Sequence, residues 1–261
     1  MPIVTLTTDF GTGDYYVGAM KGAILRIAPD THLIDISHQI PPQDVLAAAF
    51  VLRHAAGEFP PGTVHLAVVD PGVGTQRRPL ALASDDQLWV GPDNGLFSFV
   101  LDRDDTRVHH ITRRDICSPR PSGTFHGRDI FAPIAAHLSR GLNLAEVGPP
   151  ISNPVRLPET APNKSTEQIA GQIIHVDRFG NLVTNIAAAD IEPWGTALRI
   201  RLGAYVFAGL SQTYADVEEG APLTLIGSVG LLEISVNGGS AAQQLGLDRH
   251  DAILIEKNPQ R

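Results

Sequence analysis

The stretch that decides the fold is residues 3–25, IVTLTTDFGTGDYYVGAMKGAIL. Its first six residues, Ile3–Thr8, are apolar or β-branched and predict a buried strand that ends at Asp9. A glycine-containing loop follows, and apolar residues then recur at helical spacing from Val17 to Leu25. The stretch therefore predicts a strand, a loop and a helix, the repeating unit of α/β folds.

The same unit continues along the chain. Residues 31–36 and 64–69 predict two further strands, and PPQD opens a helix through residues 47–55 between them. Strands that alternate with helices predict an α/β layer with a mostly parallel sheet. Shorter strands are expected at residues 80–84, 88–90 and 107–111, with a helix at residues 130–138.

The pattern changes near residue 150. Residues 148–168, GPPISNPVRLPETAPNKSTEQ, are rich in proline and polar residues, which is typical of a linker. Short strands separated by Gly, Asn and Asp turns follow, and they predict a small β-barrel or sandwich. We therefore expect an N-terminal α/β domain at 1–150, a linker at 151–167 and a smaller β-barrel-like domain at 168–261.

Charge and composition narrow the possible partners. The formal net charge of −8 argues against nucleic acid or an anionic membrane as the partner and suits a small, cationic molecule. The single cysteine, Cys117, allows no intrachain disulfide and fits a reducing compartment. The opening MPIVTLTTDF resembles a strand rather than a signal peptide, and apolar runs are short. We expect a cytoplasmic protein that does not span a membrane.

Polar residues follow several of the predicted strands. In open parallel sheets, ligands bind beyond the carboxyl ends of the strands, so residues at these positions are candidates for function. The candidates are Asp9, His38, Asp70, Asp93, Asn94 and His126.

Simpler interpretations exist for most of these residues. Asp9 and Asp14 could be a turn residue and a helix N-cap, and His38 could be a hydrogen-bonded loop histidine. Residues 93–95, Asp-Asn-Gly, first of all predict a turn.

Asp70 is a stronger candidate. It lies in residues 68–78, VVDPGVGTQRR, where an apolar strand delivers its carboxylate into a partly dehydrated crevice. A guanidinium from Arg77 or Arg78 would keep that carboxylate ionised and fix its rotamer. His126, in TFHGRD, can exchange a proton near neutral pH.

The second predicted domain contains HVDRFGNLVTNI at residues 175–186. This stretch predicts a hairpin, but an exposed Phe179 beside Asp177 and Asn181 also suits an aromatic base, through stacking and hydrogen bonds. The later stretch GSVGLLEISVNGG, residues 227–239, is either another set of turns or a further source of polar ligand-binding groups.

Seven motifs in this order resemble the S-adenosyl-L-methionine hydroxide adenosyltransferases, the adenosine-forming S-adenosyl-L-methionine hydrolases related to fluorinating and chlorinating enzymes. The motifs are TTDFGTGDYYVGAMKG, ISHQIPPQDV, VVDPGVGTQRR, GPDNGL, TFHGRDIFAPIAAHL, DRFGNLVTNI and SVNGG. The resemblance implies an N-terminal α/β domain, a C-terminal β-barrel-like domain and a homotrimer with active sites between subunits. It also implies hydrolysis of S-adenosyl-L-methionine (SAM) to adenosine and L-methionine by attack of water or hydroxide at the ribose C5′.

The resemblance further implies roles for individual residues. Asp70, Arg77 and His126 match the catalytic residues around the attacking water, and either Asp70 or His126 could be the base. The positions that match substrate-binding residues are Asp9, Asp70, Asp177, Phe179, Asn181, Tyr214, Ser228, Glu233 and Val236. No metal and no cofactor are implied, because SAM is itself the substrate.

Two departures separate this chain from the halogenating relatives. Those enzymes are usually described with tyrosines at the positions of Asp70 and His126, and with a serine where this chain has Gly127. The fluorinating branch also carries a tryptophan where this chain has Val183. Both differences favour hydrolysis over halogenation.

Two other functions remain open from the residues alone. A metal-dependent phosphoesterase could use the Asp and His side chains at the strand ends as ligands, and would lose activity with a chelator. A nucleoside-binding or SAM-binding protein without turnover is the second alternative.

Overall fold

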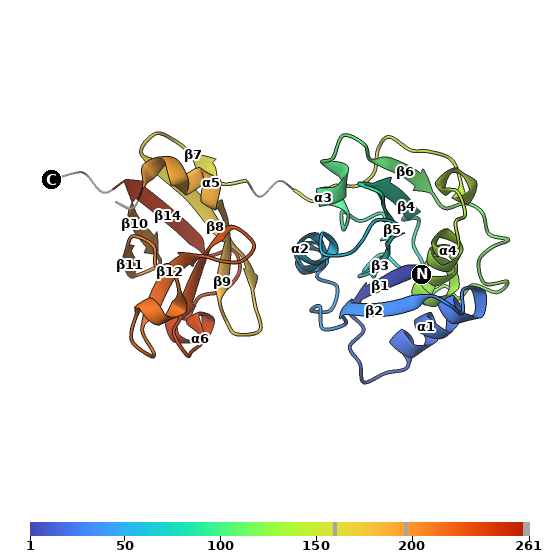
Figure 1. Ribbon diagram of the computed structural model, residues 1–261, viewed down its shortest axis with the longest axis horizontal. Coiled ribbons are helices and arrows are strands. Elements are labelled where there is room, and N and C mark those ends of the chain that lie inside the picture. The colour runs from blue at the N-terminus through green and yellow to red at the C-terminus, as the bar shows by residue number, and fades with distance from the viewer. Residues whose placement is uncertain (159–160, 196–197, 258–261) are drawn as a thin grey trace. The chain divides into compact units, whose positions relative to one another are not determined.

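The computed structural model describes residues 1–158, 161–195 and 198–257 (Figure 1). The chain divides into two compact units, Met1–Pro158 and Glu159–Arg261. Parts of the predicted linker (159–160) and of the predicted C-terminal domain (196–197 and 258–261) lie outside the described residues.

Unit 1 is a sheet of six strands with helices on both faces (Figure 1). Its strands are β1 (Ile3–Thr8), β2 (His32–Ser37), β3 (Val64–Val68), β4 (Pro79–Ser84), β5 (Gln87–Pro92) and β6 (Arg107–His110). Its helices are α1 (Tyr16–Ile27), α2 (Val45–Ala56), α3 (Ser98–Leu101), the π-helix η1 (Gly127–Phe131), α4 (Ala132–Ser139) and the 3₁₀ helix η2 (Leu144–Val147).

The strand order in this sheet is β2-β1-β3-β5-β4-β6. The pairs β1–β2, β1–β3 and β3–β5 are parallel, whereas β4 runs antiparallel to both β5 and β6. The predicted α/β domain with a mostly parallel sheet is therefore confirmed, with one reversed strand that makes the sheet mixed.

The core of unit 1 lies on the two faces of this sheet. In β3 and just after it, Leu66 and Val68 belong to the cluster that contains α1 and α4, whereas Ala67 and Val69 belong to the cluster with α2. This alternation follows from the two-residue repeat of a strand, and it explains why four of the five residues of β3 are apolar, His65 being the exception. A strand buried on both faces fixes the position at which the chain leaves the sheet, after Val68 and one residue before Asp70.

Unit 2 is an antiparallel β structure. Its strands are β7 (Asn163–Lys164), β8 (Gln168–Val176), β9 (Leu182–Ala187), β10 (Leu198–Leu202), β11 (Tyr205–Ala208), β12 (Pro222–Ile226), β13 (Leu231–Val236) and β14 (Ala252–Lys257). Short helices connect them: α5 (Ala188–Ile191), η3 (Glu192–Trp194), η4 (Tyr214–Asp216) and α6 (Ala241–Leu245).

The strands of unit 2 follow the order β11-β10-β14-β8-β9-β13-β12, with β7 paired to β8. Beyond β11, the N–H of Ser211 donates to the carbonyl of Thr224 in β12 at 2.8 Å. This bond brings the two ends of the strand order together, so the sheet is nearly closed. The predicted β-barrel-like domain is confirmed.

One local feature differs from the sequence interpretation. Asp14 does not cap α1, because the N-cap is Tyr15 and no side chain bonds to the helix end. Within unit 1, the N–H of Leu157 donates to Ser98 Oγ at 2.8 Å. Among the described helices, none is long and apolar enough to cross a membrane.

Candidate active site

Four predicted residues lie at one edge of the sheet in unit 1. Asp9, His38 and Asp93 directly follow β1, β2 and β5, and Asp70 follows β3 after one further residue. Because these four strands are parallel, their carboxyl ends share an edge, which is where ligands bind in open α/β sheets.

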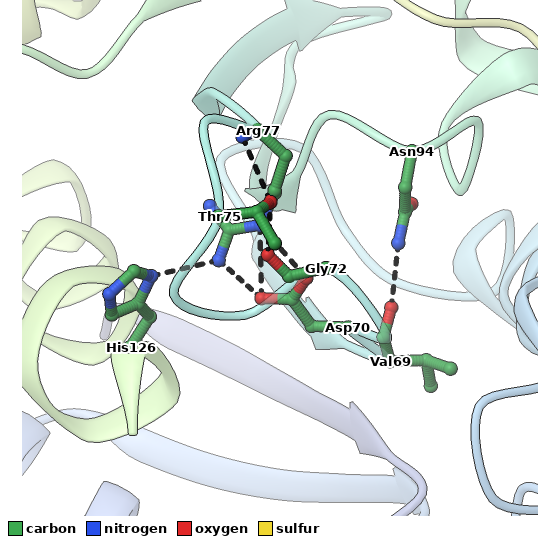
Figure 2. Close-up of polar contacts among 7 residues, drawn as sticks. All are labelled: Val69, Asp70, Gly72, Thr75, Arg77, Asn94 and His126. Atoms are coloured by element: carbon green, nitrogen blue, oxygen red, sulfur yellow. Dashed lines mark hydrogen bonds and ion pairs between the residues drawn. The ribbon is translucent and has the colours of Figure 1, made fainter. Parts of the chain in front are cut away.

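Asp70 and Arg77 form an ion pair within one loop (Figure 2). Nε of Arg77 donates to Oδ1 of Asp70 at 2.8 Å and to Oδ2 at 3.0 Å, and Nη2 also donates to Oδ2. The side chain of Asp70 is 5% exposed and that of Arg77 is 9% exposed. A buried carboxylate needs such a partner, and the two-nitrogen contact fixes the orientation of both groups.

The same guanidinium contacts His126. Nη2 of Arg77 lies 3.0 Å from Nδ1 of His126, and a guanidinium can only donate. Nδ1 therefore accepts, and the proton of the neutral imidazole lies on Nε2. Burial, reinforced by the charge of Arg77, lowers the pKa of His126 below its usual value, so the ring is neutral at pH 7.

His126 does not follow a strand, contrary to the sequence interpretation. It is the N-cap of the π-helix η1, which continues into α4. Gly127 packs tightly there, because an added Cβ would lie 3.1 Å from Sδ of Met20 and 3.4 Å from the ring of Phe125. A side chain at 127 would therefore have to displace Met20 or Phe125. π-helical turns occur frequently at functional sites.

The loop between Asp70 and Arg77 is held by its own backbone and by Thr75. Oγ1 of Thr75 donates to the carbonyl of Gly72 at 2.7 Å and accepts from the N–H of Arg77 at 3.3 Å (Figure 2). Gly74 has a positive φ of 78°, and an added Cβ would lie 2.6 Å from the carbonyl oxygen of Gly123. Sequence reasoning missed Thr75, although its place within GTQRR was a usable signal.

Arg78 has a different environment from Arg77. Its Nε donates to Oδ2 of Asp93 at 2.7 Å, and its Nη1 donates to Oδ1 of Asn153 at 2.9 Å. The two adjacent arginines therefore pair with different carboxylates: Arg77 pairs with Asp70, and Arg78 pairs with Asp93.

Asp9 and His38 lie in neighbouring loops. Oδ2 of Asp9 accepts from the N–H of Gln43 at 2.7 Å. Nδ1 of His38 lies 2.8 Å from Oγ1 of Thr8, and its Nε2 lies 3.0 Å from Oδ1 of Asp35. His38 is thus a hydrogen-bonded loop histidine.

In unit 2, the predicted residues 177–181 form the turn between β8 and β9. Oδ1 of Asp177 accepts from the N–H groups of Phe179 and Asn181, and Oδ2 accepts from the Asn181 side chain at 2.9 Å. Gly180 has a φ of 85° and leaves no space for a Cβ against Ser240. The ring of Phe179 lies at the tip of this turn and is 77% exposed, as expected from the hairpin predicted in the sequence.

Glu233 is at the centre of a second group in unit 2. This buried side chain accepts from Oη of Tyr214 at 2.8 Å and from Oγ of Ser235 at 2.7 Å. Burial and the bond to Glu233 raise the pKa of Tyr214 to about 12, so its hydroxyl stays protonated. Ser228 is exposed in the turn between β12 and β13, whereas the side chain of Val236 lies in the core.

The predicted site residues therefore fall into two groups, one in each unit. Arg77 contacts both Asp70 and His126, and Asp9 lies on the same sheet edge. Within the described residues, no group of three or more His, Cys, Asp or Glu side chains is arranged to hold a metal ion.

Comparison with known proteins adds sequence relatives to this geometry. The chain is 40% identical to an "(R)-S-adenosyl-L-methionine hydrolase" of Salinispora tropica, with 97% of each chain covered. It is 29% identical to a "Fluorinase" of an Actinoplanes species over 98% of each chain. A crystal structure of an uncharacterized conserved protein from Thermotoga maritima matches with a TM-score of 0.91 and 39% identity, covering 98% of this chain and all of the other.

Family models match both units. The model of the SAM hydroxide adenosyltransferase N-terminal domain matches residues 4–148, and that of the C-terminal domain matches residues 171–254. Together they cover most of the chain and include every residue of the Asp70, Arg77 and His126 contact. This protein therefore belongs to the SAM hydroxide adenosyltransferase family.

Proposed function

We propose that this protein is a hydrolase that converts SAM to adenosine and L-methionine, by attack of water or hydroxide at the ribose C5′. The observation that carries the proposal is the partly buried contact in which Arg77 bridges Asp70 and His126. The hydrolase of Salinispora tropica, 40% identical over nearly the whole chain, supports the same reaction.

The chemistry requires activation of the nucleophile rather than of the leaving group. The water oxygen forms a bond to C5′ while the C5′–S bond breaks. The electron pair of the broken C5′–S bond stays on sulfur. The sulfonium then leaves as a neutral thioether, so no acid is needed to protonate it. One of the two protons of the water stays on the new 5′-hydroxyl of adenosine, and the other must pass to a base. Orientation of the nucleophile can lower the barrier by roughly 7–11 kcal/mol.

We assign proton acceptance to Asp70 rather than to His126. Nδ1 of His126 is occupied by a donor from Arg77, and Nε2 carries the proton, so this ring offers a donor to the nucleophile. The carboxylate of Asp70 keeps lone pairs beyond those that Arg77 uses. Nη1 of Arg77 is buried and has no hydrogen-bond partner among the described residues, so it can donate to developing hydroxide.

The substrate-binding residues complete the proposal. Asp9 would bind the ribose hydroxyls, and Asp70 would also lie against the substrate. The exposed ring of Phe179 would stack on adenine. The other residues proposed for adenine and methionine are Asp177, Asn181, Tyr214, Ser228, Glu233 and Val236. The net charge of −8 favours a cationic sulfonium ligand.

The assembly and the compartment are also proposals. We propose a homotrimer in the cytoplasm, in which each active site combines unit 1 of one subunit with unit 2 of its neighbour. The separation of the two residue groups into different units supports this arrangement, because neither group alone supplies both a reaction centre and a base-binding surface.

Reaction in ¹⁸O-labelled water tests the proposed function. Adenosine released from SAM should carry the label at its 5′-oxygen, and the isosteric variant Asp70→Asn should release little adenosine. Unlabelled adenosine would exclude water as the nucleophile. Tight binding of SAM by calorimetry without any adenosine would instead show a binding protein.

A chelator distinguishes the phosphoesterase alternative. Asp70 and Asp93, two of its required ligands, are paired with Arg77 and Arg78, which favours the hydrolase. Adenosine release should continue after incubation with EDTA. Loss of activity that added divalent metal restores would contradict the proposed mechanism.

A further inference from the structure

The loop of residues 69–78, which carries Asp70 and Arg77, is held at both ends by one turn. At its start, Nδ2 of Asn94 donates to the carbonyl oxygen of Val69 at 2.8 Å (Figure 2). At its end, Asp93 accepts from Nε of Arg78 at 2.7 Å, and the N–H of Asp93 donates to the carbonyl of Arg78 at 2.9 Å. Asp93 and Asn94, the two residues after β5, thus form hydrogen bonds to Arg78 and Val69, which flank the Asp70–Arg77 ion pair in the sequence.

The bond from Asn94 replaces backbone pairing where the sheet ends. The register of β3 with β5 runs from Val64 opposite Leu88 to Leu66 opposite Val90. The carbonyl of Val69 lies beyond this pairing and accepts from a side chain instead. That carbonyl belongs to the peptide unit that begins Asp70, so its orientation sets the direction in which Asp70 leaves the strand.

The turn that carries Asn94 is itself fixed. Oδ1 of Asn94 accepts from the N–H of Leu96 at 3.2 Å. Gly95 has a φ of 94°, and an added Cβ would lie 2.9 Å from Leu157. Oδ1 of the buried Asp93 accepts from the N–H of Val155 at 2.7 Å. The turn is therefore a rigid support for the loop.

We propose that Asn94 is a positioning residue for the hydrolysis proposed above, and that Asp93 assists it at the other end of the loop. This inference rests on the proposed function. Asn94 acts through the backbone of Val69 and keeps the carboxylate of Asp70 in register with the guanidinium of Arg77. Neither member of the turn touches the nucleophile, so their loss affects the geometry of the reacting groups.

The variant Asn94→Ser tests this role. A serine hydroxyl can still accept from the N–H of Leu96 but is too short to reach the carbonyl of Val69. We expect kcat to fall about tenfold or more while KM for SAM changes little, because small misplacements of catalytic groups have effects of this size. An unchanged kcat would overturn the proposal.

Ser98→Ala is the matched control. Oγ of Ser98 donates to the carbonyl of Gly95 at 2.6 Å and accepts from the N–H of Leu157 at 2.8 Å. Its loss loosens the same turn without removing a bond to the 69–78 loop. We expect a kcat close to that of the unaltered protein. Equal losses in the two variants would show general loosening of the turn and contradict the proposal.

A double-variant cycle separates positioning from an independent structural role. If Asn94 acts through the Asp70–Arg77 pair, adding Asn94→Ser to Arg77→Ala should cause little further loss of kcat. If the two losses multiply, Asn94 acts elsewhere and the proposal is wrong.

Hydrogen exchange gives a readout that does not depend on the reaction. The amides of residues 70–78 should exchange faster in Asn94→Ser than in Ser98→Ala, because only the former releases the loop. Equal exchange would overturn the positioning role. Failure of the unaltered protein to release adenosine would instead overturn the proposed function, and the exchange data would still show whether Asn94 holds the loop.

Discussion

Nη2 of Arg77 lies 3.0 Å from Nδ1 of His126, so a cation donates a hydrogen bond to this imidazole. Protonation of the ring would remove the acceptor and place two positive charges together. Burial, together with the charge of Arg77, accordingly lowers the pKa of His126 from its usual value of about 6.5. Activity should therefore be constant near pH 7 and fall only at a pH below 6.5.

Titration of the His126 ring by NMR checks this first prediction. The unfolded state binds a proton as the pH falls below about 6.5, whereas the folded state does not until a lower pH, so this group also reduces stability in that range. Arg77→Ala should raise the midpoint only in part, because burial is the larger cause and remains. A midpoint at or above 6.5 in the unaltered protein would contradict the assignment.

A matched pair of substitutions separates the two adjacent arginines. In Arg77→Lys, the ammonium keeps the charge but cannot bond to both Asp70 and His126 as the planar guanidinium does. We expect kcat to fall about 10²-fold, the usual effect of removing one stabilising donor. In Arg78→Lys, the pairing with Asp93 can persist, and kcat should change only a few-fold at most. Steady-state kinetics of both variants measures these changes in kcat and shows which arginine the reaction requires.

The result for Arg78→Lys also tests the sequence interpretation. If that variant alone lost turnover, the residue matched to the catalytic arginine would be wrong by one position. Thermal unfolding of both variants should accompany the kinetics, since Asp93 is buried and depends on Arg78 for its charge partner.

The strands of unit 1 and the pairing of Asp70 with an arginine were predictable from local sequence. Both follow from short-range rules: apolar β-branched runs form buried strands, and a carboxylate at the mouth of such a strand needs a nearby cation. Arg77 lies seven residues from Asp70, within reach of one loop. The choice between Arg77 and Arg78 depended on the family resemblance, and the contacts in the structure agree with it.

Other parts of the site depend on contacts that local sequence does not contain. The role of Asn94 arises from the neighbouring positions of β3 and β5, which are set by sheet order rather than by the Asn-Gly turn pattern. His126 lies at a π-helix, an element without a recognisable local pattern. The strand β11 alternates half-buried and exposed residues over only four positions, so its signal was weak.

His65 gives a prediction about stability that is independent of the active site. It stacks on Trp89 at a ring separation of 4.3 Å and is fully buried. Desolvation lowers the pKa of His65 to about 4. The free energy of unfolding should therefore fall as the pH drops from about 6.5 towards 4, by up to roughly 3 kcal/mol from this group. Denaturant unfolding at several pH values should show a smaller fall in His65→Phe.

Phe179 should contribute to binding and not to stability. Its ring is 77% exposed, so Phe179→Ala should change the free energy of unfolding by no more than about 0.5 kcal/mol. Loss of stacking on adenine should raise KM for SAM about tenfold. Val206→Ala is the control, because this side chain in unit 2 is also exposed, at 53%, and is not proposed to bind substrate. An unchanged KM in Phe179→Ala would remove that residue from the proposed site.

Mixed oligomers test whether the active site is shared between subunits. Light scattering should first show a trimer. Arg77→Ala alters unit 1 and Phe179→Ala alters unit 2, so every site in either homotrimer contains one altered residue. Both homotrimers should therefore have low activity at low SAM concentration.

In mixed trimers, obtained by co-expression with two different tags, unit 1 of a Phe179→Ala chain can meet unit 2 of an Arg77→Ala chain. Such sites are fully intact, and the mixed trimers should exceed the mean activity of the two homotrimers. If each site lay within one chain, no combination would restore it, and activity equal to that mean would contradict the shared site.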